Sequence, residues 1–169
     1  SGVSGGGVSP AASAVVTWDS DGLGPLLPQV VVGGNFVTAG AITGNGIARW
    51  DGAAWRTLGT GVARIAGSPS VAALATVDFD GAGPLPPEIV AGGTFDSAGG
   101  IAASNIARWD GLAWRAMSVG LDGPVSVLAM WDPDGPGAAP AQLIAGGSFL
   151  NSGATPVNCI ARWDGTQWR

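Results

Sequence analysis

Pairs of aspartates separated by one residue recur three times, and of all the residues in this chain they could most readily do chemistry. Each pair is followed directly by glycine, and the pairs are Asp19 and Asp21, Asp78 and Asp80, and Asp132 and Asp134. Carboxylates at this spacing could begin a calcium loop, but calcium takes about six to eight oxygens, and no third aspartate or closing glutamate follows. The same pattern is typical of a turn in which aspartate accepts backbone N–H groups and glycine takes a positive φ. The pattern therefore favours a turn and leaves calcium binding as the alternative.

A second motif, Arg-Trp-Asp-Gly-x-x-Trp-Arg, also occurs three times. Its tryptophans are Trp50, Trp55, Trp109, Trp114, Trp163 and Trp168, and its first arginines are Arg49, Arg108 and Arg162. Tryptophan faces with arginine and aspartate nearby could bind a glycan. Tryptophan also packs well between structural repeats, and arginine can pair with aspartate or stack on an indole. Because the motif returns in every copy, the structural role is favoured and glycan binding is the alternative.

Histidine, the most common general base of enzymes, is missing from the chain. There is no histidine, so a Ser-His-Asp triad and most zinc, iron and copper sites are excluded. Cys159 is the only cysteine, so neither a disulfide framework nor a cysteine-based metal site is expected. Asp96, Asp122 and Glu88 lie outside the repeated motifs, and nothing in their spacing suggests that they converge. We therefore expect no enzyme and no certain cofactor, with calcium as the possible exception.

The two motifs belong to a longer repeat, in which Gly-Gly-x-Phe precedes Ile-Ala-Arg-Trp-Asp-Gly. The second copy follows the first by 59 residues and the third follows the second by 54. The whole difference lies in the connection between the second tryptophan and the next aspartate pair. Repeats of this length indicate an array of supersecondary units that bury their faces only against one another. Residues 1–169 therefore form one repeat array.

Each copy reads as four β-strands. The first is a short apolar run, the second ends at Gly-Gly, the third is Ile-Ala-Arg-Trp and the fourth begins at the second tryptophan. The predicted first strands are 14–18, 71–79 and 125–131, and the predicted second strands are 29–33, 88–92 and 142–146. Asp-Gly between the two tryptophans signals a hairpin. No segment has a helical period, so the predicted fold class is all-β, with the four-stranded antiparallel blades of a β-propeller.

The repeat resembles the delta-60 repeat family of bacterial β-propellers and, more loosely, kelch repeats. The residues that carry the resemblance are 32–36 with 45–52, 91–95 with 105–111, and 145–149 with 158–165. The resemblance covers almost the whole chain. The chain departs from the family in having tryptophan where the family usually has leucine, followed by a shorter turn.

The expected blades are residues 11–59, 69–118 and 124–169. Three blades do not close a ring, since propellers have about four to eight. Unpaired edges and open blade faces are templates for association. Either the array is part of a longer one or copies associate: two copies would give six blades, three would give nine, and open stacking would give a filament. Residues 1–10 align with the connection after a fourth strand, so they are expected to complete a blade of a neighbouring copy.

The composition limits the classes of partner that the chain is expected to bind. The net charge is −5 and all seven basic residues are arginines, so no basic stripe is left for nucleic acid. No apolar run approaches the length of a membrane-spanning helix. A lysine-free chain rich in glycine and tryptophan resembles secreted bacterial propellers. We therefore expect an extracellular or cell-surface structural module whose partners are other copies of itself, with a glycan- or calcium-dependent binding propeller as the alternative.

Overall fold

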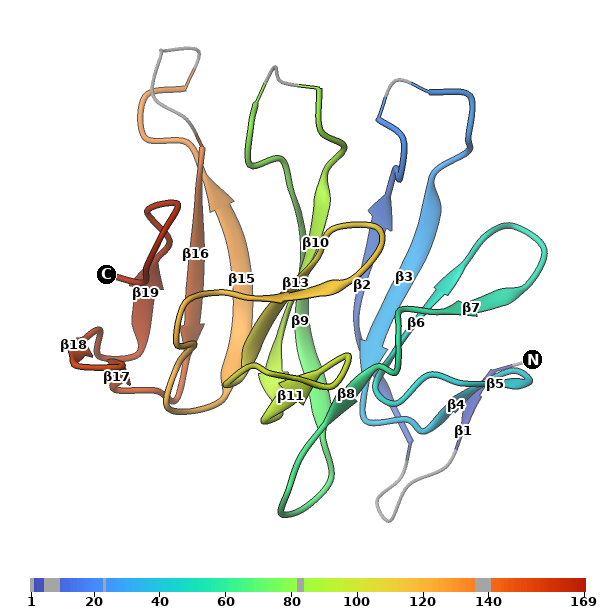
Figure 1. Ribbon diagram of the computed structural model, residues 1–169, viewed down its shortest axis with the longest axis horizontal. Coiled ribbons are helices and arrows are strands. Elements are labelled where there is room, and N and C mark those ends of the chain that lie inside the picture. Colours follow the sequence, from blue (N-terminus) through green and yellow to red (C-terminus); the bar gives the residue numbers. More distant parts are fainter. Residues whose placement is uncertain (1, 5–9, 23, 82–83, 136–140) are drawn as a thin grey trace.

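The computed structural model describes residues 2–4, 10–22, 24–81, 84–135 and 141–169. These residues form β-strands, turns and loops, with no helix among them. The all-β prediction is therefore confirmed. The strands build several small antiparallel sheets, and three of these sheets lie side by side along the long axis (Figure 1).

Each copy of the repeat supplies one of these three sheets, which we call the first, second and third repeat sheets. The first contains, in spatial order, β2 (Ala12–Trp18), β3 (Gln29–Gly34), β6 (Ile47–Trp50) and β7 (Trp55–Thr57). The second contains β9 (Ser70–Val77), β10 (Glu88–Thr94), β13 (Ile106–Trp109) and β14 (Trp114–Ala116). The third contains β15 (Val125–Trp131), β16 (Gln142–Gly147) and β19 (Ile160–Arg162), and an isolated bridge joins Trp163 to Trp168 at the place of the fourth strand.

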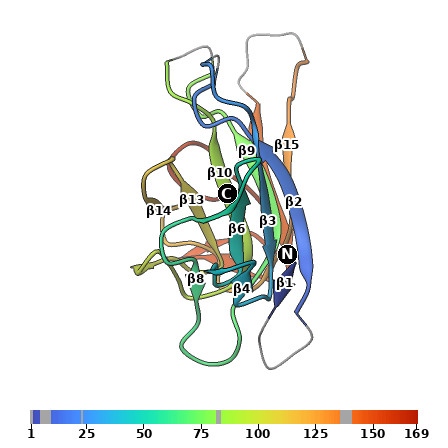
Figure 2. The same cartoon turned by 90° about the vertical axis from the view of Figure 1, so that its right-hand side faces the viewer.

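The four-stranded pattern is thus present in the first two repeat sheets. The predicted strand 71–79 is too long at its end, because β9 ends at Val77 and Asp78 begins a turn. The predicted Asp-Gly hairpin is present: Trp50 pairs with Trp55 and Trp109 with Trp114. The first strands β2, β9 and β15 lie toward one edge of the molecule, and β14 lies toward the opposite edge (Figure 2).

Smaller strands tie each connection to the following repeat. β1 (Val3–Ser4) pairs with β4 (Thr38–Ala39), which forms a hairpin with β5 (Ile42–Thr43). In the same way β8 (Val62–Ala63) pairs with β11 (Ser97–Ala98), whose hairpin partner is β12 (Ile101–Ala102). The third repeat has the hairpin of β17 (Asn151–Ser152) and β18 (Thr155–Pro156). The chain leaving the first repeat therefore adds β8 to the hairpin of the second repeat, whereas the described small sheet of the third repeat contains only β17 and β18.

The hydrophobic core lies between the repeat sheets. One cluster joins the first sheet to the second and includes Trp18, Ile47, Ile89 and Trp114. A second cluster joins the second sheet to the third and includes Val90, Ile106, Leu143 and Trp168. Successive residues of β10 belong to different clusters, so the middle sheet is buried on both faces. The middle repeat sheet therefore has one face toward the first repeat and one face toward the third.

The Gly-Gly motif permits these close approaches. A Cβ on Gly92 would lie 2.5 Å from Val125 of the following repeat, and a Cβ on Gly33 would lie equally close to Val71. A Cβ on the second glycine, Gly93, would lie 2.0 Å from the carbonyl oxygen of Ser70. The first glycine therefore admits the following repeat and the second admits the adjacent strand, where the register shifts.

Candidate functional site

The tryptophan pair of each repeat forms a compact aromatic contact. The rings of Trp109 and Trp114 lie 5.7 Å apart at 63°, an edge-to-face arrangement, and the other two pairs are similar. Both of these rings belong to the core that joins the first and second repeat sheets. The indole N–H of Trp114 donates a 2.8 Å hydrogen bond to the carbonyl oxygen of Leu58. Trp109 and Trp114 therefore contact the preceding repeat.

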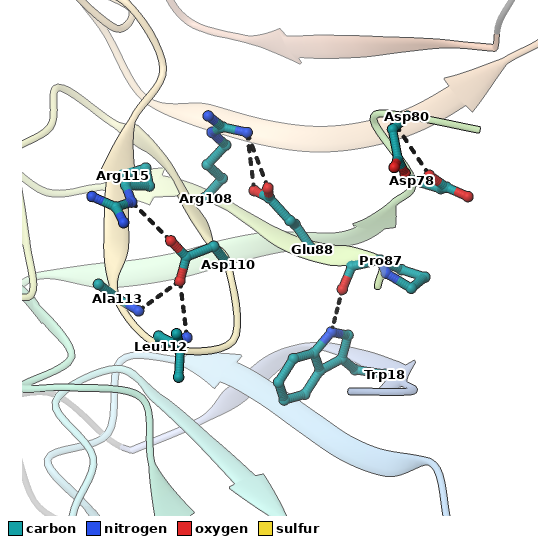
Figure 3. A network of polar contacts seen from close by, with 10 residues as sticks. All are labelled: Trp18, Asp78, Asp80, Pro87, Glu88, Arg108, Asp110, Leu112, Ala113 and Arg115. Atoms are coloured by element: carbon teal, nitrogen blue, oxygen red, sulfur yellow. Dashed lines mark hydrogen bonds and ion pairs between the residues drawn. The ribbon is translucent and has the colours of Figure 1, made fainter. Parts of the chain in front are cut away.

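The aspartate of the same motif closes its turn. Asp110 Oδ1 accepts the N–H groups of Leu112 and Ala113, and its Oδ2 lies 2.8 Å from Arg115 Nε (Figure 3). Burial raises the pKa of Asp110, but these hydrogen bonds together lower the pKa by more than burial raises it, so the net shift is downward. Asp51 and Asp164 form the same contacts with Arg56 and Arg169. In this motif the second arginine of each repeat is therefore held by the turn.

The first arginine of the motif has a partner that the sequence reading missed. Arg108 Nη1 lies 3.1 Å from Glu88 Oε1 (Figure 3), and its guanidinium lies 5.3 Å from the ring centre of Phe79. At the corresponding places Arg49 bonds to Gln29 and Arg162 bonds to Gln142. The partner stands 20 residues before the arginine in every copy, and this spacing was the available signal.

Replacing Glu88 with glutamine is expected to stabilise the protein at neutral pH. Burial raises the pKa of Glu88 above its usual value despite the opposing charge of Arg108, so ionisation costs folding free energy above that pKa. As the pH falls through the raised pKa, the wild-type carboxyl becomes neutral and the advantage of Glu88→Gln shrinks. Urea unfolding at about pH 7 and about pH 4 measures this difference. A variant less stable than wild type at neutral pH would contradict the expectation.

The Asp-x-Asp pairs have the geometry of turns. Asp78 Oδ1 accepts the N–H groups of Asp80 and Gly81 at 3.2 and 2.8 Å, and Figure 3 shows the first of these bonds. Asp19 and Asp132 accept the equivalent N–H of Asp21 and Asp134. Parts of these loops, residues 23, 82–83 and 136–140, lie outside the described residues.

The described part of these turns shows no group of metal ligands. Within the described residues no three acidic, histidine or cysteine side chains are grouped as metal ligands. Asp21 Oδ1 is buried without a hydrogen-bond partner among them, but it offers one oxygen where calcium takes about six to eight. Calcium and glycan binding therefore stay predictions from the sequence pattern.

The remaining acidic residues hold the connections. Asp96 Oδ2 accepts the N–H of Ile65 at 2.7 Å. Asp122 accepts the N–H groups of Leu150 and Asn151 at 2.8 and 3.0 Å. Each of these bonds joins a hairpin to the chain that enters from the preceding repeat, so these carboxylates are engaged in holding the fold.

The outer face of the third repeat sheet is apolar and exposed. We call it the C-terminal face, and define it by Trp131, Ile144 and Ile160. Trp131 is 51% exposed, whereas the equivalent Trp18 is 2% exposed between the first two sheets. Ile160 is 65% exposed, whereas the equivalent Ile106 is fully buried. The residue types that fill the junctions inside the chain are therefore uncovered at this end.

The outer face of the first repeat sheet is also exposed, and it carries the residues that face a preceding repeat elsewhere in the chain. We call it the N-terminal face, and define it by Val15, Val30 and Trp50. Val15 is 67% exposed, whereas its equivalent in the second sheet, Leu74, is 8% exposed. Trp50 is half-buried, whereas Trp109 lies in the core. The two outer faces thus correspond to the two sides of each internal junction.

The predicted role of residues 1–10 falls partly outside the described residues. Val3 and Ser4 pair with Ala39 and Thr38 of the same chain, in the position that β8 takes in the second repeat. These two residues are therefore accounted for within one chain. Residues 1 and 5–9 are not described, and their completion of a neighbouring blade stays a prediction.

The described part of the chain contains no helix long and apolar enough to cross a membrane. Comparison with known protein families, curated proteins and solved structures finds no match to this chain.

Proposed function

We propose that the chain is a β-propeller module, of the kind that delta-60 repeats form, which associates head to tail with other copies. The observation that carries the proposal is the exposure of Trp131, Ile160 and Val15. The counterparts of Trp131 and Ile160 are buried in both internal junctions, and the counterpart of Val15 in the second repeat, Leu74, is buried in the first junction. Exposed apolar patches of this kind mark interaction surfaces. Inside the chain the same residue types pack against another repeat, so a further repeat of the same type is the partner that fits these faces.

The internal junctions indicate how two copies would meet. Inside the chain, the indole N–H of Trp18 donates to the carbonyl oxygen of Pro87 in the following repeat, at 2.6 Å (Figure 3). Trp131 is the counterpart of Trp18, and Pro28 at the start of the first repeat sheet is the counterpart of Pro87. In the proposed contact the Trp131 indole therefore covers the N-terminal face of the next copy and donates to Pro28.

This contact joins two different surfaces, so it is heterologous. A heterologous contact makes a ring if its rotation closes and a filament if it does not. The proposed role is consequently structural, in an extracellular or cell-surface assembly. Asp96, Asp110 and Asp122 are engaged in turns and connections, which fits a structural role.

Light scattering on the isolated chain tests the proposal. The measured mass should rise above the 16.6 kDa of one chain as the concentration increases through the micromolar range. Apolar burial at the junction provides the driving force, so the mass should change little with added salt. A monodisperse monomer at every concentration would contradict self-association.

A further inference from the structure

The junction between the second and third repeat sheets contains a hollow. Its volume is about 860 Å³, and its walls include Val77, Phe79, Met130, Leu143, Trp163 and Gly165. It lies between two sheets of one chain, whereas the proposed assembly joins two chains, so the two proposals can be tested separately.

The hollow lies where the first junction has a tryptophan. Trp18 is buried there against Gly111, where a Cβ would lie 3.8 Å from Trp18 Cζ2. Val77 stands at the equivalent position in the second repeat, and a Cβ on Gly165, the counterpart of Gly111, would meet nothing within 4 Å. The space that an indole fills beside Gly111 is therefore open beside Gly165.

The hydrogen bond of that indole also has no counterpart. Trp18 donates to the carbonyl oxygen of Pro87, and Ala141 stands at the equivalent position and lines the hollow. Valine has no N–H to offer. A ligand that carries an aromatic N–H would restore both the packing and the hydrogen bond.

The second repeat has an aromatic residue, Phe79, two positions after Val77, and it lies at the side of this space. Phe79 stands where the first repeat has Ser20, and it lines the hollow with 37% of its surface exposed. The Arg108 guanidinium lies over one side of its ring. The ring is therefore a wall against which a flat ligand can stack, and it does not fill the gap that Val77 leaves.

Carboxylates at the hollow add a preference for positive charge. Asp78 and Asp80 both line it, and neither forms an ion pair with a described residue. Arg162 also lines it, and its guanidinium is bonded to Gln142. Asp164, the other acidic residue of the lining, is paired with Arg169. The unpaired charge beside the hollow is negative.

We propose that this hollow binds a planar aromatic amine of indole size. The ring takes the place of the Trp18 indole beside Gly165 and stacks near Phe79 and Trp163. Its N–H donates to the carbonyl of Ala141, and its ammonium group lies near Asp78 and Asp80. The apolar walls, the Ala141 carbonyl and the two carboxylates define the class of ligand, and tryptamine is the simplest member to use as a probe.

Titration calorimetry of the folded chain with tryptamine tests this site. Wild type should show saturable binding of one tryptamine per chain. Indole-3-acetate has the same ring and the opposite charge, and should bind about tenfold more weakly or not at all. Equal binding of the two would overturn the charge preference, and an absence of saturable tryptamine binding would overturn the site.

Variants locate the binding. Val77→Trp should fill the hollow and abolish tryptamine binding, while Ile65→Trp, which adds a tryptophan at a 95% exposed position, should leave it intact. If Val77→Trp does not fold, Met130→Trp at the wall of the hollow serves the same purpose. Trp18→Val should open the equivalent space in the first junction, but Ser20 stands there in place of Phe79, so a second tryptamine should bind more weakly than the first. Binding that persists unchanged in both filling variants would place tryptamine elsewhere and overturn the proposal.

Discussion

Replacing Trp131 with aspartate is expected to keep the chain monomeric at concentrations where the wild type assembles. The indole is half-exposed at the end of β15 on the C-terminal face, and its counterpart Trp18 is almost fully buried in the first internal junction. A tryptophan buried at an interface contributes about 2 kcal/mol or more to binding, and a carboxylate in its place would be desolvated without a partner. Sedimentation velocity at matched concentrations measures the effect.

Leu112→Asp is the matched control for this change. Leu112 is 89% exposed in the turn between the two tryptophans of the middle repeat, so it lies on neither outer face. The control should assemble as the wild type does. If Trp131→Asp assembled as readily as Leu112→Asp, the C-terminal face would not be the contact surface.

Trp114→Ala is expected to lower the free energy of unfolding by about 3–5 kcal/mol, the range for removing a large buried aromatic side chain. Trp114 is 4% exposed, donates to Leu58 of the preceding repeat and meets Trp109 edge to face. A Cβ on Gly99 would lie 2.6 Å from its ring, so the ring is closely packed on that side too.

Trp55→Ala makes the matched comparison, because Trp55 occupies the same place in the first repeat. Trp55 is half-buried on the N-terminal side, where the described chain has no preceding repeat sheet. Its replacement should cost clearly less in dilute solution, where copies are separate. Urea unfolding of both variants tests this, and equal losses would contradict the view that these tryptophans act by packing between repeats.

The repeat pattern predicts the large strands because apolar residues alternate within them. Val30 and Val32 lie on one face of β3 and Val31 lies on the other. The Gly-Gly that follows marks where neighbouring chain comes close. The two-residue strands β1 and β8 could not be predicted in this way. They lie in glycine-rich connections too short to show alternation, and their partners are fixed by the way successive repeats stack.

The candidate site could be predicted only in part from the sequence. The motif shows that Trp109 and Trp114 belong together, but the partner of Arg108 lies on a different strand, and its charge differs between copies. The replacement of Trp18 by Val77 is visible in an alignment of the three copies. That it leaves space beside Gly165 depends on how two sheets pack, which spacing along one chain does not specify.

The central claim is that the C-terminal face of one copy meets the N-terminal face of the next, and mixing two single-face variants tests it most directly. Trp131→Asp blocks the first face and Val15→Asp blocks the second, so each variant alone should remain a monomer. An equimolar mixture still offers one intact face of each kind and should form a one-to-one dimer with twice the 16.6 kDa chain mass in the analytical ultracentrifuge. A dimer formed by either variant alone, or a mixture that stays monomeric at concentrations where wild type assembles, would contradict head-to-tail association.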